Sequence, residues 1–534
     1  MTLRLLSPSW RTSLLACLRR PALWILLGIL IGLAWLRIFH PLLLPMFHDE
    51  GLHISRAQRV LSEHTLLMGT EGGKYLQVWL LALALPLNAK PLLTARILSA
   101  VIGTLAGIGC YLLARRLYER DDVALIATAL CAIVPYALFF DRMGLADGLL
   151  SALAIWSLLL SLITVRQPRW WSTLALGLCL GLASATKLNG ILFLAFPLLA
   201  AWLWRDECSL PRILPYVLVA WLLAIPWLLP SLLDFTPQFK STVGRSWVDS
   251  AADGIPHLTR LGQNSNTIAM TLWTYLTVPY LLLALAELVR SLRHRDKSSW
   301  LLALAALITL AFFFLTAGVG KFYPRYILSA FPFLLIMAAR SLVALAEWLW
   351  ERAPRTESRK RDRKSRLRAG LLAALVLLAS LPALRFDYLL LTDPSRAPWL
   401  PIDRWQYVDG WPAGYAVADA TAYLRQQADE LGVIIVVKRA TSEMRTGAWV
   451  HYLNQSNIIF DAINFRHADP QELMQALKNA PAPVFLALDR PFEDLYAADF
   501  TNDGPYAPYS SLIATFPRPG GASRIEIYRL QPNP

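Results

Sequence analysis

Charged residues are scarce in this sequence. They make up 16% of the chain, whereas 56% of the residues are hydrophobic. Soluble domains carry about 25% charged residues, and a soluble chain of 534 residues would form several domains, each with a polar surface. The scarcity of charge excludes that architecture. Acidic residues are especially few, with 37 Asp and Glu against 51 Lys and Arg, so the net charge is +14.

Several motif classes are also missing. The five cysteines include no CxxC pair, and none lies in a segment that we expect on the extracytoplasmic side, so neither a disulfide framework nor a cysteine-based metal site is indicated. There is no GxxxxGK[ST] phosphate-binding loop to power an ATP-driven exporter. Internal repeats and low-complexity tracts are absent from the sequence as well.

Long apolar runs are what the sequence does contain. A membrane-spanning helix needs about 20 largely apolar residues. Eleven runs approach this length: 22–42, 94–114, 122–140, 143–165, 171–186, 188–204, 213–231, 269–289, 299–317, 326–350 and 369–386. The first has no small-residue cleavage site, so we interpret it as a retained helix and not as a signal peptide. The fold class predicted is an α-helical polytopic membrane protein with about eleven transmembrane helices.

Basic residues predict the orientation of these spans. Counted over the connecting segments, about twice as many Lys and Arg fall on one side as on the other, and the richer side is expected to be cytoplasmic. The N-terminus is then cytoplasmic and, after eleven spans, the C-terminus is extracytoplasmic, in a multi-pass protein of the plasma membrane. The basic stretch 352–368 is interpreted as a stop-transfer signal that contacts anionic membrane lipids. No aromatic platform accompanies it, so no nucleic-acid partner is predicted.

The last part of the chain is more polar and alternates two kinds of pattern. Helices are predicted over 417–431 and 471–480, and strands over 433–437, 457–460, 484–488 and 524–530. We therefore divide the chain into a transmembrane domain, 1–386, and a C-terminal extracytoplasmic α/β domain, 387–534.

The first outer loop contains two adjacent carboxylates, Asp49 and Glu50, between His48 and His53. Carboxylates just beyond a span are costly near lipid unless they are used. The run that follows is amphipathic and predicts a helix along the interface. Its apolar stripe is Ile54, Ala57 and Leu61, and its charged stripe is Arg56, Arg59 and Glu63. The alternative is a solvated loop whose acids offset nearby arginines.

Five cations are expected at the same membrane face as this carboxylate pair: Lys74, Arg142, Lys187, Lys321 and Arg325. Each alone could be an interface anchor that extends toward water. Together they suit an anionic headgroup, such as a lipid phosphate, held beside a general base. Asp147 lies just inside an apolar run, where an unpaired carboxylate is expensive.

These residues resemble a known family, the GT-C superfamily of polytopic glycosyltransferases, and within it glycosyltransferase family 39, the group similar to protein mannosyltransferases and aminoarabinose transferases. The resemblance covers about residues 20–350. It rests on short segments in the family's order: Asp49-Glu50, Arg96-Ile97-Leu98-Ser99-Ala100, Arg142-Met143-Gly144-Leu145-Ala146-Asp147, Thr186-Lys187 and Arg325-Tyr326. One departure is that Gly72-Gly73 precedes Lys74, where many relatives have Lys-Pro-Pro. Tyr407, Gly410-Trp411 and Gly414-Tyr415 also look like a segment of bacterial relatives.

The resemblance implies inverting transfer of a hexosyl or pentosyl group from a polyprenyl-phosphate-linked donor to a hydroxyl of a lipid, glycan or protein acceptor. Asp49 would be the general base, and Glu50 and His48 would shape its surroundings or seat the acceptor, supported by His53 and Arg56. Lys74, Arg142, Lys187, Lys321 and Arg325 would meet the donor phosphate. Asp147 would orient a cation or bind a sugar hydroxyl.

Other interpretations remain open at this point. No cofactor is required, although His48, Asp49, Glu50 and His53 could also hold a divalent cation; the closeness of the two acids favours metal-free chemistry. A lipid or glycolipid transporter (flippase) would also carry membrane charges, but closer to mid-bilayer. A non-enzymatic membrane scaffold would have no need of the Asp49-Glu50 pair.

Overall fold

The chain forms two compact units in a computed structural model. The first comprises Met1–Pro41, Leu66–Leu80 and Arg96–Leu389, and the second comprises Leu42–Thr65, Leu81–Ala95 and Leu390–Pro534. The structure describes residues 21–66, 74–230, 257–316, 322–352, 361–439, 448–463, 470–491, 500 and 504–532.

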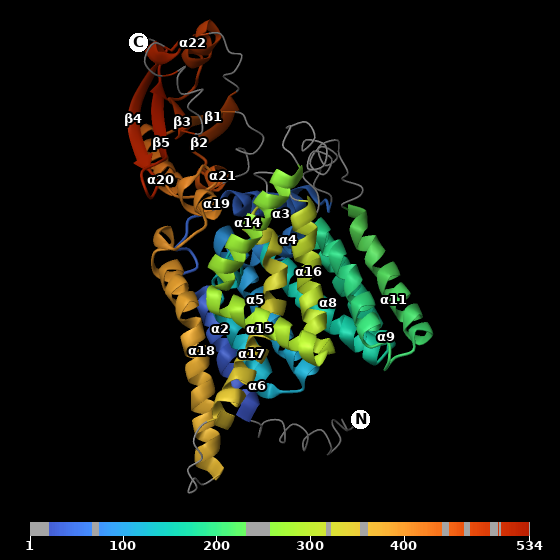
Figure 1. The fold of residues 1–534 in the computed structure, drawn as a ribbon. Helices are drawn as coiled ribbons and strands as arrows, with labels where there is room; N and C mark the ends of the chain where they lie inside the picture. Colours follow the sequence, from blue (N-terminus) through green and yellow to red (C-terminus); the bar gives the residue numbers. More distant parts are fainter. Residues whose placement is uncertain are drawn as a thin grey trace, which may run out of the picture. The chain divides into compact units, whose positions relative to one another are not determined.

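The first unit is helical (Figure 1). Its α-helices, three of which (α4, α5 and α18) extend into the second unit, are α2 (Pro21–Ile38), α4 (Tyr75–Ala84), α5 (Pro91–Tyr118), α6 (Asp121–Ile133), α7 (Pro135–Phe140), α8 (Ala146–Arg166), α9 (Trp170–Thr186), α10 (Phe196–Leu203), α11 (Leu210–Ala224), α14 (His257–Thr271), α15 (Val278–His294), α16 (Lys297–Thr316), α17 (Phe331–Arg352) and α18 (Arg361–Thr392). Short 3-10 or π turns adjoin them: η1 (Leu85–Leu87), η2 (Leu188–Ala195), η3 (Ile225–Leu228), η4 (Leu272–Leu276) and η5 (Pro324–Ala330).

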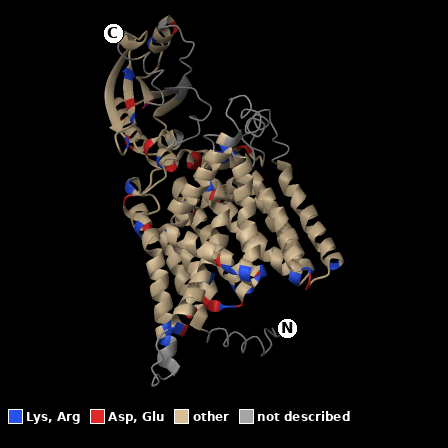
Figure 2. Ribbon diagram, viewed as in Figure 1, with Lys and Arg blue, Asp and Glu red and all other residues tan. Residues whose placement is uncertain are grey.

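Seven of the described helices are long and apolar enough to cross a membrane, or eight if one bent pair counts as a span. This confirms a multi-span helical protein, with fewer full-length spans than the eleven predicted. The predicted spans 171–186 and 188–204 correspond to apolar helices of less than full length, Trp170–Thr186 and Leu188–Leu203. The helices carry few charges along their length, and these gather mainly near helix ends (Figure 2).

Two predicted spans are interrupted, each just before a proline. The prediction of one helix over 269–289 is wrong, because Thr277 has φ 70° and the flanking helices meet at 110°. The predicted span 122–140 is also broken, since Val134 is extended between α6 and α7. Proline suits the first turn of a new helix, and before Pro135 it also disfavours a helical conformation at Val134. Pro135 and Pro279 therefore restart the helices, a signal already present in the sequence.

The helices of the first unit differ in burial. α8 and the continuous run from η5 through α17 are largely buried, whereas α2 and α18 are largely exposed. Leu76 of α4, Ile102 of α5, Leu149 of α8 and Ala185 of α9 form one buried apolar cluster. The first turn of α8 and the last turn of α9 therefore belong to a packed helical core.

The second unit is an α/β domain with a five-stranded mixed sheet in the order β2-β1-β3-β5-β4 (Figure 1). β1 pairs in parallel with β2 and β3, and β5 pairs antiparallel with β3 and β4. The strands are β1 (Ile434–Arg439), β2 (Ile458–Ile463), β3 (Val484–Arg490), β4 (Ser510–Pro517) and β5 (Arg524–Leu530). The helices and turns are α3 (His48–Glu63), η6 (Pro394–Arg396), α19 (Pro401–Arg404), η7 (Trp405–Asp409), α20 (Val417–Leu431), α21 (Ala448–Tyr452), α22 (Pro470–Lys478) and η8 (Ala507–Tyr509).

The α/β prediction is confirmed, and all four predicted strands are present. β4 is the strand that the sequence did not predict. It lies at the edge of the sheet, and its side chains are partly or fully exposed. The core of the sheet includes Leu486 and Tyr528, against which Leu473 and Leu477 of α22 pack.

Candidate functional site

The predicted acidic pair lies in the first turn of α3, in the second unit. Phe47 is extended at the helix N-cap, and the Glu50 carboxylate accepts a hydrogen bond of 3.0 Å from its backbone N–H. Glu50 is fully buried, whereas Asp49 is only half-buried. Carboxylates in a first turn are stabilised by the helix dipole. The geometry thus separates the two acids: Glu50 helps to form the helix start, and Asp49 is the more accessible.

A C-terminal segment packs directly against the residues before Asp49. The His48 N–H donates a 3.0 Å hydrogen bond to the Pro412 carbonyl. The His48 ring lies edge-on to Trp411 with centroids 5.0 Å apart, and the Phe47 ring lies edge-on to Tyr407 at 4.9 Å. Two segments that are more than 350 positions apart in sequence therefore build one local structure around the start of α3.

Gly414 makes this approach possible, because a Cβ at that position would collide with the Met46 carbonyl and would lie 2.8 Å from Pro45 Cβ. The Met46 N–H also donates a 3.3 Å hydrogen bond to the Tyr452 hydroxyl of α21. The glycine is thus required by close packing of two backbones.

His451 contacts the other side of the Asp49 turn. Its Nε2 lies 3.1 Å from the Gly51 carbonyl oxygen and 3.2 Å from Ser55 Oγ. Burial lowers the pKa of His451 below its ordinary value, although the hydrogen bond to Gly51 acts in the opposite direction. The neutral imidazole is therefore favoured, with its N–H donating to the carbonyl. His451 and Tyr452 contact residues on either side of Asp49 in the sequence, Gly51 and Met46, and sequence reasoning did not single out either of them.

The remaining predicted residues of α3 lie on its buried face. His53 and Arg56 are almost fully buried, as are Ile54 and Ala57. The predicted division into stripes is therefore wrong for two residues: Arg56 is inside, and Leu61 is 41% exposed. The two other charged residues of the predicted stripe behave as expected, since Arg59 and Glu63 form an exposed ion pair of 3.0 Å.

A second group of predicted residues lies in the first unit. Lys187 Nζ donates a 2.6 Å hydrogen bond to Asp147 Oδ1, and both side chains are largely buried. Asp147 is in the first turn of α8, and Lys187 is the extended residue that follows α9. The Lys187 ammonium also lies 5.3 Å from the centroid of the Tyr326 ring. The structure therefore brings Asp147, Lys187 and the Arg325-Tyr326 segment together.

Arg325 is linked to Lys187 by two tyrosine rings that contact each other. Its guanidinium carbon lies 5.0 Å from the Tyr323 ring centroid, and the Tyr323 and Tyr326 rings are edge-on at 5.7 Å. The two cations thus lie over neighbouring tyrosines of one turn, which begins at Pro324. A cation over an aromatic face gains stability from the ring quadrupole. Lys321 lies outside the described residues.

Arg142 has a different environment. Its guanidinium donates hydrogen bonds to the carbonyls of Leu36, Arg37 and His40, at 2.5, 3.4 and 3.1 Å. These carbonyls lie at and just beyond the C-terminal end of α2, where helix carbonyls lack intrahelical partners. Arg96 donates in the same way to the Pro41 carbonyl at 2.7 Å. The two arginines therefore fix the end of α2, from which the chain leads to Asp49.

Lys74 is half-buried, and its carbonyl accepts a hydrogen bond from Val78 N at the start of α4. Gln77 follows one turn later and is fully buried. Neither polar atom of its amide has a hydrogen-bond partner within the described part of the chain. A buried amide without a partner is costly, so Gln77 is a candidate ligand-binding residue that the sequence did not reveal by pattern.

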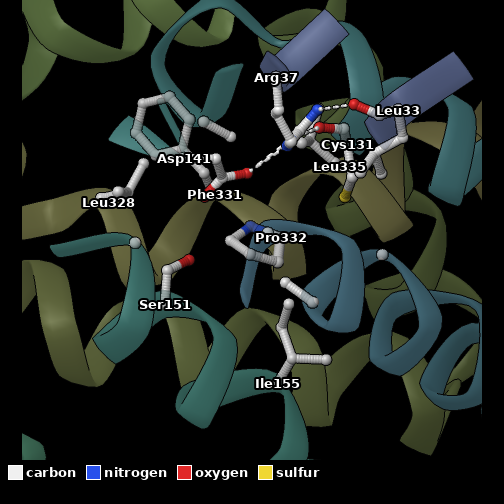
Figure 3. A pocket seen from close by; sticks show the side chains of 15 residues that line it. Leu33, Arg37, Cys131, Asp141, Ser151, Ile155, Leu328, Phe331, Pro332 and Leu335 are labelled. Carbon is white, nitrogen blue, oxygen red and sulfur yellow. Dashed lines mark hydrogen bonds and ion pairs between the residues drawn. The ribbon is translucent and has the colours of Figure 1, made fainter. Parts of the chain in front are cut away.

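A buried ion pair between Arg37 and Asp141 also escaped sequence analysis. The Nη2–Oδ2 distance is 2.7 Å, and both side chains are nearly fully buried (Figure 3). Gly103 leaves room for the carboxylate, since a Cβ there would lie 2.6 Å from Asp141 Oδ2. The pair borders a cavity of about 20 Å³. An arginine inside an apolar helix requires a buried partner, so Arg37 could have signalled the pair.

Possible metal ligands are not grouped in the described residues: no three His, Cys, Asp or Glu side chains there lie close enough to hold an ion. The possible divalent cation at His48, Asp49, Glu50 and His53 stays a prediction.

This fold, with several apolar helices and a C-terminal α/β domain, defines a class of multi-span membrane protein. Residues 75–232 match the family described as dolichyl-phosphate-mannose-protein mannosyltransferase. That stretch includes Arg142, Asp147 and Lys187 but not Asp49. No curated protein sequence matches the chain significantly.

Several solved structures share this fold at low sequence identity. ArnT from Cupriavidus metallidurans in the apo state is 15% identical with a TM-score of 0.58, over 94% of this chain and 97% of that one. The same protein bound to undecaprenyl phosphate is 15% identical with a TM-score of 0.59, over 95% and 98% of the chains. AglB from Archaeoglobus fulgidus, in complex with an inhibitory peptide and a dolichol-phosphate, is 14% identical with a TM-score of 0.50, over 94% and 74%. The likeness establishes the fold and confirms the resemblance to GT-C glycosyltransferases of the family 39 type.

Proposed function

We propose that this protein is a membrane glycosyltransferase that transfers a hexosyl or pentosyl group from a polyprenyl-phosphate-linked donor to an acceptor hydroxyl, with inversion, at the extracytoplasmic face of the plasma membrane. The fold carries the proposal, because nearly the whole chain superposes on ArnT, a protein solved with undecaprenyl phosphate bound. The family match over residues 75–232 supports the same chemistry. In this orientation the N-terminus is cytoplasmic and the C-terminal domain is outside.

Asp49 is the general base in this proposal. Its half-buried carboxylate lies in a helix start that is held by Glu50 and flanked by His48, His451 and Tyr452. A base must be within hydrogen-bond reach of the proton that it removes, and so it must be both accessible and fixed. Glu50 meets only the second condition, because it is fully buried and bound to a backbone N–H. We therefore assign proton removal to Asp49 and positioning to Glu50.

The donor phosphate is assigned to the group around Lys187. The leaving group is a phosphate, so negative charge develops on it during transfer and has to be met by positive charge. Lys187 and Arg325 supply two cations on one aromatic turn. Asp147 orients the Lys187 ammonium through the 2.6 Å hydrogen bond. Lys74, Lys321 and Gln77 are assigned to the same donor as further contacts.

The proposed step balances as follows. The acceptor oxygen forms a bond to the anomeric carbon of the donor as its proton passes to the Asp49 carboxylate. The bond between the anomeric carbon and the phosphate oxygen breaks, and its electron pair leaves with the polyprenyl phosphate. Attack from the face opposite the leaving group inverts the anomeric centre, and no covalent sugar–enzyme intermediate forms.

Mass spectrometry of glycoconjugates from a strain that lacks this protein tests the proposal. We expect one glycoconjugate to lose a single sugar residue, and we expect the wild-type gene to restore it. Unchanged glycoconjugates together with an altered distribution of a lipid between the two leaflets would contradict the proposal and indicate a flippase. Unchanged glycoconjugates and lipids would indicate a scaffold.

A further inference from the structure

Two tryptophans, Trp405 and Trp411, lie in contact at the segment that packs against His48. The indole rings of Trp405 and Trp411 have centroids 6.3 Å apart and meet at 84°, so they form a corner. Trp411 is half-buried against His48, the residue before Asp49. Trp405 is 40% exposed. Trp411 thus packs against the residue that precedes the predicted base, and Trp405 is accessible to a ligand.

The turn that carries Trp405 is held rigidly by its backbone and its neighbours. Trp405 begins the π-helical turn η7, and its carbonyl accepts a 2.7 Å hydrogen bond from Gly410 N. Gly410 is needed here, because a Cβ would lie 2.7 Å from the indole Nε1 and 2.8 Å from Cδ1. π-Helical turns inside helices occur often at functional sites. An exposed indole on a fixed turn presents a large apolar face with little loss of conformational entropy on binding.

Charged and polar groups border the same turn. Arg404 Nε lies 2.7 Å from Asp409 Oδ2, and both side chains are partly exposed. Below them, the buried Asp403 carboxylate accepts a 3.2 Å hydrogen bond from Gln406. An aromatic floor with a few fixed polar groups at its edge is typical of small-molecule sites. A sugar ring matches this chemistry, because it has an apolar face of C–H groups and a rim of hydroxyls.

We propose that Trp405 and Trp411 form an acceptor subsite that binds a sugar ring, so that the acceptor is a carbohydrate-bearing molecule. The sugar ring of the acceptor stacks on Trp405 and contacts Trp411 with its edge. This position holds a neighbouring hydroxyl of the acceptor at the first turn of α3, which carries Asp49. Arg404 and Asp409 bind hydroxyls at the rim. The inference rests on the proposed glycosyl transfer, and it selects a glycan over a polypeptide as the acceptor.

Transfer kinetics in membranes test this subsite. The assay uses a labelled polyprenyl-phosphate sugar as donor and, as acceptor, graded amounts of the glycoconjugate fraction from the strain that lacks the protein. For Trp405→Ala we expect the acceptor KM to rise about tenfold, equivalent to roughly 1.4 kcal/mol of binding, with the donor KM unchanged. Trp405→Tyr keeps an aromatic face, so it should retain most of the wild-type acceptor affinity. Trp171→Ala is the matched control, because Trp171 is 54% exposed and lies on α9.

Pretreatment of the acceptor fraction distinguishes the acceptor classes. Periodate, which cleaves vicinal diols of sugars, should abolish acceptor capacity, whereas protease should leave it intact; the reverse result would overturn the inference. An unchanged acceptor KM in Trp405→Ala would also overturn it. Equal loss of membrane-integrated protein in Trp405→Ala and Trp171→Ala would instead identify Trp405 as an interface anchor. In each of these outcomes the wild-type protein still transfers the sugar. If the wild-type protein transferred no sugar from any donor, that result would contradict the proposed function itself.

Discussion

The Lys187 ammonium donates a 2.6 Å hydrogen bond to the Asp147 carboxylate, and it lies 5.3 Å from the Tyr326 ring centroid. The acid lies in the first turn of α8 and the cation directly after α9, in a packed helical core. A buried pair of this kind is weak as a source of stability, because desolvation offsets most of its Coulomb attraction. We therefore attribute the Asp147–Lys187 pair to the orientation of the Lys187 ammonium toward a ligand.

Replacing Lys187 separates a role in folding stability from a role in orienting a cation toward the donor. We expect Lys187→Gln to lower transfer about a hundredfold or more, the effect of removing one donor that stabilises developing charge. The variant also leaves Asp147 buried without its cation, which costs about 3–5 kcal/mol of folding free energy. The double variant Asp147→Asn/Lys187→Gln should therefore regain thermal stability but not transfer. Lys297→Gln is the control, because Lys297 pairs with the exposed acids Asp206 and Glu207, at 3.4 and 3.5 Å. Recovery of transfer in the double variant would assign the pair to folding alone.

Arg142 is expected to affect stability more than donor binding. Its guanidinium joins three carbonyls at the end of α2, and hydrogen bonds to a charged group are each worth about 1.5–3 kcal/mol. Arg142→Gln should lower the Tm, and Arg142→Lys should not restore it, because an ammonium is a point charge without the planar fork of a guanidinium. The measurements are Tm in detergent and donor KM. An unchanged Tm with a raised donor KM would instead make Arg142 a phosphate ligand.

Gly103 provides the space for the buried carboxylate of Asp141. In Gly103→Ala the new methyl carbon would lie 2.6 Å from Asp141 Oδ2, so we expect the Arg37–Asp141 pair to shift and stability to fall by about 1–3 kcal/mol. Gly32→Ala on α2 is the matched control, since no atom lies within 4 Å of its Cβ position. That change should be neutral or stabilising by about 0.5–1 kcal/mol. Equal Tm values for Gly103→Ala and Gly32→Ala would contradict the inference that glycine at position 103 makes room for the Asp141 carboxylate.

The contact between α21 and α3 should depend on pH. The folded protein holds the pKa of His451 below its unfolded value, so between the two values the unfolded chain binds more protons and stability rises with pH. Stability from this contact is therefore complete above about pH 6.5 and is lost as the pH falls below it. The groups of α3 that contact the imidazole are the Gly51 carbonyl and the Ser55 hydroxyl.

Thermal unfolding of His451→Gln checks this expectation. Gln keeps an N–H donor but does not titrate, so between about pH 7.5 and about pH 5.5 its Tm should fall less than that of the wild type. Parallel Tm curves for the two proteins would show that His451 does not carry the pH dependence.

The sequence predicted the parts of the fold that depend on local pattern. Apolar runs located most helices, and strand-like runs located four strands, whereas β4, at the exposed edge of the sheet, was missed. The cost of a lone carboxylate in an apolar run indicated that Asp147 has a partner, but the structure was needed to identify that partner as Lys187. The packing of Trp411, His451 and Tyr452 around the Asp49 turn could not be predicted, because it joins segments distant in sequence and depends on backbone contact at Gly414.

The assignment of Asp49 as the base is the central claim, and complementation measures it most directly. The strain that lacks the protein would express wild type, Asp49→Asn or Glu50→Gln, with membrane levels matched, and mass spectrometry would quantify the restored sugar. A general base contributes about 10²–10⁴-fold, so Asp49→Asn should restore less than about one hundredth of the wild-type amount. Glu50→Gln, whose amide oxygen can still accept from Phe47 N, should retain much more. Restoration by Asp49→Asn at the wild-type level would contradict the account.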